Sequence, residues 1–425
     1  MEYTKVCYLC DSIFMGKTPV YSEEETPYKV LGQKNNQKTG IDLNGIKYLT
    51  KDFYEGRKDN EFLKNGDILL NSLGGGSVGR IGFYNLKDNE YLTDGHLIIY
   101  RPNKSTNNKF LYYCLYSKQK ELEDMAVGST NQCFLNVSDI YKMPLPSPCI
   151  NEQARIADFL DKKVSEIDAV ISKTKESIEE YKKLKQSIIT EAVTKGLDSN
   201  VEMKDSGIKE IGLISSEWKC LKIKYVLIPG EDSIKVGPFG SSIRGKMLPD
   251  GEYKVYNQAH LISGDFSLNR HFINKETYEE LKQYRVIPGD ILFSMMGTIG
   301  KCRVMPEGFP EGIMDSHLIK GRLNEDVVNK NYFQYVYDKD NSRIVIDQYL
   351  KGSKGTIMDG LNSTVIKNVY ITLPDIKEQR QIVEYLDNQC SKYDDLISKK
   401  EEVITELEQY KKSLIYEYVT GKKEV

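Results

Sequence analysis

Two stretches of the chain, residues 151–196 and 376–425, carry apolar side chains at alternating steps of three and four positions. This spacing is typical of a coiled-coil seam, so both stretches are predicted to form long helices. The first stripe consists of Ile156, Leu160, Val164, Ile167, Ile171, Thr174, Ile178, Tyr181, Leu184, Ile188 and Ala192. The matching positions in the second are Ile382, Leu386, Cys390, Tyr393, Ile397, Lys400, Ile404, Leu407, Tyr410, Leu414 and Tyr418.

Helices of about 45 residues are roughly 68 Å long at 1.5 Å per residue, which exceeds the width of the neighbouring globular parts. Packing of each helix on its own domain is one alternative. We favour intramolecular antiparallel pairing of the two helices, in which a residue near the pseudo-two-fold axis faces its own counterpart. Thr174 and Lys400 interrupt the two stripes at the same level. They are therefore predicted to lie near the crossing centre, as a polar pair that fixes the register.

The helices are part of a longer internal duplication. Residues 152–194 align without a gap to residues 378–420, at an offset of 226. Upstream, NGDILLNSLGGGSVGRIGFY at 65–84 resembles PGDILFSMMGTIGKCRVM at 288–305, and TDGHLIIYRPN at 93–103 resembles MDSHLIKGRLN at 314–324. An internal repeat indicates one structural unit used twice. Each half is therefore expected to be a globular part followed by a long helix.

Within the globular parts, short apolar runs such as 67–70 and 290–293 are preceded by glycine, which favours strands, whereas residues 112–120 and 332–338 have the pattern of short helices. The predicted fold class is α+β, with two mixed α/β domains and an intramolecular antiparallel coiled coil. The expected boundaries are domain 1 at 1–150, helix 1 at 151–196, a turn-rich linker at 197–216, domain 2 at 217–375 and helix 2 at 376–425.

Composition agrees with a soluble, multidomain chain of 425 residues, because 40% of the residues are hydrophobic and 28% are charged. The sequence shows neither a secretory signal nor a run of 18 apolar residues, so a cytoplasmic location is expected. Eight scattered cysteines are expected to be buried thiols. Cys7 and Cys10 have the spacing of half a zinc site, but no second pair completes it.

The net charge of −3 argues against a protein that coats nucleic acid by charge alone. Residues 1–150 contain 18 basic and 18 acidic residues, and residues 217–375 contain 21 and 20. Any DNA binding must therefore depend on locally focused basic groups or on a partner. We expect binding by this chain alone to be weak, and binding with partner subunits to be stronger and salt-sensitive.

The order of domain, helix, related domain and helix resembles the specificity subunit of Type I restriction-modification enzymes over nearly the whole chain. The segments that carry the resemblance are PLPSPCINEQARIADFLD, TLPDIKEQRQIVEYLD, the linker MKDSGIKEIGLISSEW, GPFGSSI at 237–243 and the two GDIL turns. The resemblance implies that each domain reads one half of a split, asymmetric site in double-stranded DNA, with the helices setting the gap. It also implies two methyltransferase subunits that methylate adenine at N6 with S-adenosylmethionine, and restriction and translocase subunits that use ATP and Mg.

Catalytic motifs are missing from the sequence. A methyltransferase would need a glycine-rich cofactor loop and an Asn-Pro-Pro-Tyr-like site, and neither is found. GGGSVG at 74–79 is followed by Arg80 and Ile81, where a Walker loop requires Lys and then Ser or Thr. The run is either a tight turn between strands or a turn that also approaches DNA phosphate. His96 and His317 occupy equivalent positions and are expected to be structural, so the chain is predicted to be a non-catalytic subunit.

Residues that contact DNA are expected in loops rich in Lys, Arg, Ser, Thr and Asn at equivalent places in both halves. The candidates are Lys17, Thr18, Arg80, Ser129, Thr130 and Asn131 in domain 1, and Ser241, Ser242, Arg244, Lys301, Ser353 and Lys354 in domain 2. A protein-interaction scaffold, such as a silent allele without DNA reading, is an alternative function. A self-sufficient modification enzyme is disfavoured by the missing motifs.

Overall fold

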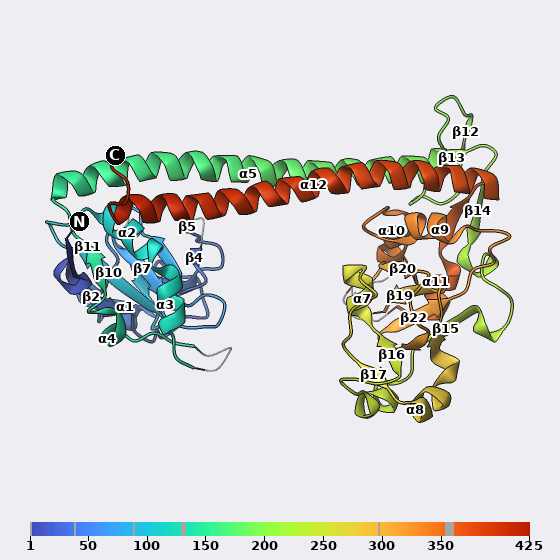
Figure 1. Cartoon of the computed structure of the whole chain (residues 1–425), viewed down its shortest axis with the longest axis horizontal. Coiled ribbons are helices and arrows are strands. Elements are labelled where there is room, and N and C mark those ends of the chain that lie inside the picture. Colours follow the sequence, from blue (N-terminus) through green and yellow to red (C-terminus); the bar gives the residue numbers. More distant parts are fainter. Residues whose placement is uncertain (1, 38–39, 88–89, 129–132, 296–297, 353–360) are drawn as a thin grey trace. The chain divides into compact units, whose positions relative to one another are not determined.

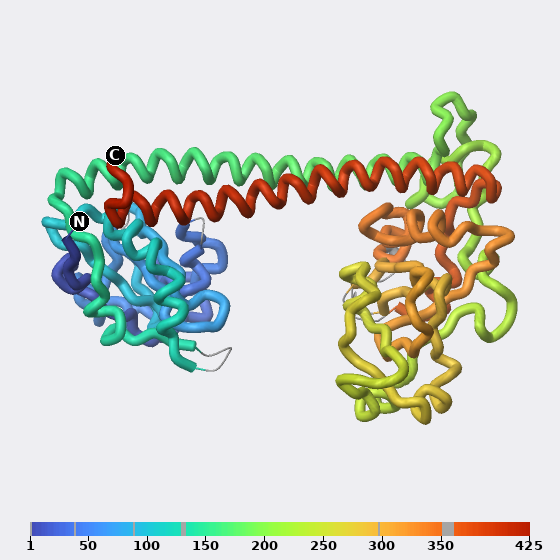
Figure 2. The backbone as a smooth tube through the Cα atoms, in the orientation of Figure 1, coloured from blue at the N-terminus to red at the C-terminus, as the bar shows by residue number. Residues whose placement is uncertain are grey.

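The computed structural model describes residues 2–37, 40–87, 90–128, 133–295, 298–352 and 361–425. The chain divides into two compact units: unit 1 comprises Met1–Lys175 and Glu401–Val425, and unit 2 comprises Glu176–Lys400. Each unit contains one globular part and a segment of each long helix. Figure 2 shows that both chain ends belong to unit 1.

Unit 1 is built around a four-stranded antiparallel sheet. Its order is β2 (Cys10–Met15), β10 (Leu97–Pro102), β7 (Ile68–Asn71) and β8 (Ile81–Phe83). A three-stranded sheet has the order β6 (Lys47–Tyr48), β3 (Lys29–Leu31) and β9 (Tyr91–Thr93), with β3 parallel to β9. Two small pairs, β1 (Tyr3–Lys5) with β11 (Pro144–Pro146) and β4 (Asn36–Gln37) with β5 (Gly40–Ile41), complete the strands described.

Unit 2 repeats this topology. Its four-stranded sheet has the order β15 (Ile234–Val236), β22 (Leu318–Gly321), β19 (Ile291–Ser294) and β20 (Cys302–Val304). The second sheet has the order β17 (Phe272–Ile273), β16 (Tyr253–Tyr256), β21 (Gly312–Met314) and β18 (Arg285–Val286), again with one parallel pair, β16 and β21. β14 (Lys219–Lys222) pairs with β23 (Tyr370–Leu373). The duplication predicted from the sequence is therefore also a duplication of strand order.

Short helices flank the sheets in both units (Figure 1). Unit 1 has α1 (Lys51–Glu55), α2 (Asn108–Ser117), α3 (Gln119–Met125) and α4 (Val137–Ile140). Unit 2 has α6 (Gly240–Ile243), α7 (Gln258–Ser263), α8 (Lys275–Glu280), α9 (Lys330–Tyr337), α10 (Ile344–Gly352) and α11 (Ser363–Asn368). The mixed α and β class is confirmed, and α2 and α9 lie where the sequence indicated short helices.

A buried ion pair fixes the GDIL turn of each unit. In unit 1 the Arg101 guanidinium donates to both carboxylate oxygens of Asp67, at 2.9 and 2.7 Å. In unit 2 the Arg322 Nε donates to Asp290 Oδ1 at 2.8 Å. Asp67 and Asp290 directly precede the central strands β7 and β19. Arg101 lies near the end of the neighbouring strand β10, and Arg322 directly follows β22. This ion pair gives a structural reason for the Asp of the repeated GDIL sequence.

The two long helices, α5 (Ile150–Lys195) and α12 (Ile376–Val419), pair antiparallel within each unit. In unit 1 Lys411 Nζ lies 2.5 Å from Asp168 Oδ1, and in unit 2 Lys185 Nζ lies 2.6 Å from Asp394 Oδ2. Asp394 and Lys411 stand 226 positions after Asp168 and Lys185. The same inter-helix ion pair therefore occurs once in each unit, with the two helices exchanging roles.

The apolar stripes pack both on the partner helix and on the globular core. The core of unit 1 includes Ile156, Leu160, Ile167 and Ile171 of α5 and Leu414, Ile415 and Val419 of α12, with Ile404 and Leu407 at its edge. The core of unit 2 includes Ile189, Ala192 and Val193 with Ile382, Leu386 and Cys390. Ile178 is buried and Ile397 half-buried. Each long helix therefore packs both on its partner helix and on the globular domain, so the two alternatives are both correct.

Thr174 and Lys400 stand at the border between the units. The Thr174 hydroxyl donates to Val170 O within its own helix, at 2.8 Å. Lys400 Nζ lies 5.5 Å from the centre of the Tyr181 ring, in unit 2. Their placement near a crossing centre stays a prediction.

A glutamine clamps the start of each long helix to the domain before it. The Gln379 side chain accepts from Asn329 N at 2.7 Å and donates to Pro374 O and Val327 O at 2.9 and 3.1 Å. In unit 1 the Gln153 side chain accepts from the backbone N–H of Asn107 and donates to Pro148 O, both at 2.8 Å. Both glutamines are buried. This clamp gives a physical reason for the glutamine of the repeated Glu-Gln sequence at the helix start.

The segment predicted as a linker contains an antiparallel hairpin, β12 (Met203–Asp205) and β13 (Leu213–Ser215). Ile211 and Ile214 are buried in the core of unit 2. Directly after the hairpin, the buried Trp218 donates from Nε1 to Glu378 Oε2 at 2.9 Å. The segment is therefore part of the packed structure of unit 2, because its apolar residues reach the core that surrounds α12.

Candidate nucleic-acid interface

In both units an Asp-x-His turn follows the strand that is paired in parallel, β9 or β21. The backbone N–H of His96 donates to Asp94 Oδ1, and that of His317 donates to Asp315 Oδ1, each at 2.9 Å. The carbonyls of His96 and His317 accept from Ser72 N and Met295 N in the neighbouring strand segments. These bonds are made by the backbone, and the two imidazole rings are about half exposed, so the structural role expected for the histidine side chains stays a prediction.

A glycine at the end of the first sheet strand packs directly on this turn. A Cβ added to Gly16 would lie 2.1 Å from Asp94 O, and one added to Gly237 would lie 1.9 Å from Asp315 O. Only glycine permits such a close approach. The segments GKTP and GPFG are consequently held at the same place in the two units, and both carry residues proposed to contact DNA.

In unit 2, Ser241, Ser242 and Arg244 are all exposed around the short helix α6. Gly240 and Arg244 line a cavity of about 560 Å³ together with Arg270, His271 and His317. Arg270 and His271 come from the segment before β17, which sequence comparison of the two halves did not indicate. The fold therefore adds a second arginine to the candidates from the GPFG segment.

In unit 1, Lys17 and Thr18 are exposed at the equivalent place. Lys17 lines a cavity of about 280 Å³ with Arg57, Lys58 and Glu61. Lys17 Nζ lies 2.5 Å from Glu61 Oε1, and Arg57 Nε lies 3.9 Å from Glu61 Oε2. The hydrogen bond from Lys17 lowers the pKa of Glu61, so this carboxylate partly neutralises the cations around it.

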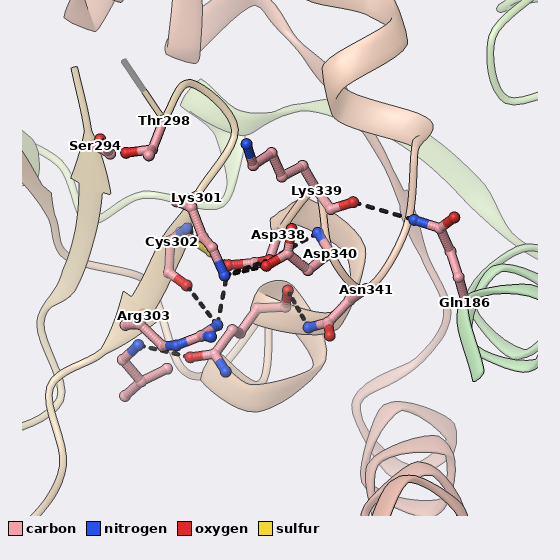
Figure 3. A network of polar contacts seen from close by, with 12 residues as sticks. Gln186, Ser294, Thr298, Lys301, Cys302, Arg303, Asp338, Lys339, Asp340 and Asn341 are labelled. Carbon is pink, nitrogen blue, oxygen red and sulfur yellow. Dashed lines mark hydrogen bonds and ion pairs between the residues drawn. The ribbon is translucent and has the colours of Figure 1, made fainter. Parts of the chain in front are cut away.

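Arg80 and Lys301 follow the glycine-containing turns after β7 and β19, and both are held by their own units. Arg80 Nη1 donates to Asn36 O at 3.1 Å and to Gln37 Oε1 at 3.2 Å. Lys301 is buried, forms an ion pair with Asp340, and lies 3.9 Å from Asp338 Oδ1 (Figure 3).

The carboxylate of Asp338 is fully buried in this network and accepts from Arg303 Nη1 at 3.0 Å. Burial raises the pKa of Asp338, while Arg303 and Lys301 oppose that rise. Releasing Lys301 to DNA would remove one of the cations that offset a buried charge, which is costly. Its position therefore argues against the expected DNA contact, and we leave Lys301 out of the proposed interface.

The remaining candidates, Ser129, Thr130, Asn131, Ser353 and Lys354, lie outside the described residues. The GGGSVG run forms a tight turn between β7 and β8: Ser77 N and Val78 N donate to Gly74 O at 3.1 and 2.9 Å, and Gly79 N donates to Asn71 O at 2.9 Å. Gly74 and Gly79 have φ values of 94° and 82°, which favour glycine. Whether this turn also approaches phosphate stays a prediction.

The Cys7–Cys10 pair lies at the start of unit 1. Burial raises the pKa of Cys10 to about 12, which disfavours the thiolate that zinc requires. Over the described ranges, no group of three or more His, Cys, Asp or Glu side chains is arranged to hold a metal ion.

Among the residues that the structure describes, no helix is both long and apolar enough to cross a membrane.

The fold defines a class of protein in which two mixed α/β domains of the same topology are each clamped to a pair of long antiparallel helices. A family model described as the Type I restriction modification DNA specificity domain matches the chain twice, at residues 6–180 and 232–408. The two matches cover most of the chain and reproduce the internal duplication. The chain therefore belongs to this family, and its function is DNA sequence specificity in a type I restriction-modification system.

Individual relatives agree with the family assignment. The putative type I restriction enzyme MjaX specificity subunit of Methanocaldococcus jannaschii is 25% identical over 362 residues, which cover 84% of this chain and 78% of that protein. The MjaVIII specificity subunit of the same organism is 25% identical over 342 residues, covering 76% of this chain and 72% of its own. A solved chain from work on complex assembly and conformational transition of the type I R-M system has a TM-score of 0.67 at 16% identity, covering 98% of this chain and 97% of that chain. This last likeness supports the fold.

Proposed function

We propose that the chain reads a bipartite, asymmetric site in double-stranded DNA, with one half-site for each globular domain. The observation that carries this proposal is that the two units share the strand order of their four-stranded sheet and the parallel pair of the second sheet, but differ in surface chemistry. At matching places, unit 1 presents Lys17 tied to Glu61, whereas unit 2 presents Arg244 and Arg270 around a larger cavity. Two equivalent frames with different reading surfaces give a two-part site that is not a palindrome.

The long helices would set the unspecified gap between the half-sites. A clamp by Gln153 or Gln379 fixes each domain to the start of its helix, and an inter-helix ion pair occurs at the same level in each unit. The clamp fixes the position of each domain on its helix, and the ion pair resists sliding of one helix along the other. A fixed register is what a ruler between two readers requires.

The chain is proposed to direct adenine-N6 methylation and restriction without catalysing either. The absence of cofactor-loop and adenine-site motifs from the sequence supports a non-catalytic role. Two methyltransferase subunits would supply S-adenosylmethionine chemistry, and restriction and translocase subunits would supply ATP- and Mg-dependent chemistry. Exposed apolar side chains on the long helices, among them Val170, Leu184, Val403 and Tyr410, offer surface for protein partners. This role places the chain in the cytoplasm, with access to the chromosome.

A genome-wide map of methylated adenines, with the gene intact and deleted, tests this function. Loss of methylation at one split, asymmetric motif on deletion is the expected result, and it would give both half-sites and the gap. An unchanged map, with partner subunits still assembling on the chain, would instead favour a protein-interaction scaffold or silent allele. Methyl transfer by the purified chain alone would overturn the non-catalytic assignment.

A further inference from the structure

The cavity beside α6 in unit 2 brings together two arginines and two histidines from three separate segments. Arg244 begins a 3-10 turn (Arg244–Lys246), Arg270 and His271 precede β17, and His317 follows β21. Arg244 and Arg270 are exposed. Within the described ranges neither guanidinium forms an ion pair with a carboxylate, so no internal bond must break before either binds an anion.

One carboxylate, Asp315, also lines this cavity, but it is mostly occupied by its own turn. Asp315 is 8% exposed, accepts the backbone N–H of His317 at 2.9 Å, and has Oδ2 3.4 Å from His317 Nδ1. Burial raises its pKa, which weakens the charged form. The two guanidinium groups are therefore the exposed charged groups of the cavity, beside an apolar lining from Met247, Leu248 and Pro249. The cavity of unit 1 differs, because there Glu61 engages Lys17.

We propose that the cavity in unit 2 is a binding site for backbone phosphate of duplex DNA, with Arg244 and Arg270 as its ligands. This inference rests on the proposed DNA-reading function. A planar guanidinium matches phosphate oxygens with two parallel hydrogen bonds, and both of these guanidinium groups line the same cavity. Such a contact sets the position of the domain on the duplex and does not itself read sequence.

The surroundings favour a nucleic-acid strand over a free anion. Phe239, just before α6, is 84% exposed. Its backbone is held in place because Ser242 N donates to Phe239 O at 2.8 Å and Gly237 packs on Asp315 O. This solvent-exposed phenyl ring precedes Gly240, which lines the cavity, and it offers an apolar contact for a sugar or base next to the phosphate. Inorganic phosphate would leave that ring in water.

The test measures binding of the full chain, assembled with its methyltransferase partners, to a duplex carrying the motif found by methylation mapping. The slope of log Kd against log salt concentration counts the phosphate contacts. Arg244→Gln and Arg270→Gln are each expected to reduce that slope by roughly 1, and to weaken matched and mismatched duplexes equally. Lys209→Gln is the matched control, because it removes the same charge from an exposed turn of unit 2 outside the cavity.

The phosphate site would be overturned if Arg244→Gln and Arg270→Gln gave the same slope as Lys209→Gln. Unchanged fluorescence of the buried Trp218 would show that the variants are folded, and DNA reading would remain intact. Wild-type complex without motif-specific binding would overturn the DNA-reading function and this inference with it. Titration with inorganic phosphate separates the sources of the anion. Arginine-dependent phosphate binding combined with unchanged DNA slopes would identify a free-anion site and refute the proposal.

Discussion

The glutamine clamp of unit 2 can be tested by replacing Gln379 with Leu, which keeps most of the volume but removes three hydrogen bonds. The amide accepts from Asn329 N and donates to two backbone carbonyls, and the side chain is fully buried. Each lost hydrogen bond costs about 0.5–1.5 kcal/mol, and a buried N–H left without a partner costs about 1–3 kcal/mol. Gln379→Leu is therefore expected to lower the free energy of unfolding of unit 2 by about 2–4 kcal/mol.

Trp218, the one tryptophan of the chain, provides the measurement. It is buried in the core of unit 2, and its indole donates to Glu378, the residue next to the clamp. Urea unfolding followed by Trp218 fluorescence therefore reports on the region that the substitution affects. Gln381→Leu, at an exposed position of the same helix, is the control and is expected to change stability by less than about 0.5 kcal/mol. Equal stability of the two variants would refute the clamp.

Three further predictions concern the helices and unit 1. Asp168 faces Lys411 across the helix pair. Asp168→Lys is expected to lower the free energy of unfolding by less than about 1 kcal/mol, and adding Lys411→Asp is expected to restore it, as measured by thermal unfolding. Glu61, whose pKa is lowered from 4.5 by Lys17, stabilises unit 1 above that pH and loses this contribution as the pH falls through its folded pKa. In Glu61→Gln, the stability of unit 1, measured by hydrogen exchange, should therefore fall less as the pH is lowered. The same substitution frees Lys17 and should make DNA binding more dependent on salt concentration. Seven residues added to each helix should lengthen the gap in the methylation map by about three base pairs and leave both half-sites unchanged.

Each of these has a clear contrary outcome. An Asp168→Lys, Lys411→Asp double variant no more stable than the single variant would mean that the ion pair does not hold the helices. Acid destabilisation identical in wild type and Glu61→Gln would assign the effect to other carboxylates. A methylation gap that does not change with helix length would remove the ruler from the proposed function.

Several features of the fold could be predicted from the sequence because they depend on local or repeated patterns. The three-and-four spacing located the long helices, and α5 begins at Ile150, within one residue of the prediction. The internal repeat predicted two domains of one kind, and the shared strand order confirms this. The hairpin at 203–215 was missed, since strands of three residues give no periodic signal and the buried Ile211 and Ile214 gain their packing only from unit 2.

Whether a basic loop residue is exposed or held in an internal ion pair was decided by the tertiary structure. Lys301 and Arg244 both lie near glycine-containing turns, and nothing in the local sequence separates them. The segment after α9 brings Asp338 and Asp340 to Lys301 and keeps it buried, whereas Arg244 and Arg270 are exposed and line one open cavity. The sequence by itself determined the duplicated architecture and its helices, because periodicity and repetition are properties of the chain. Which cations stay available to DNA depended on carboxylates that only folding brings near them.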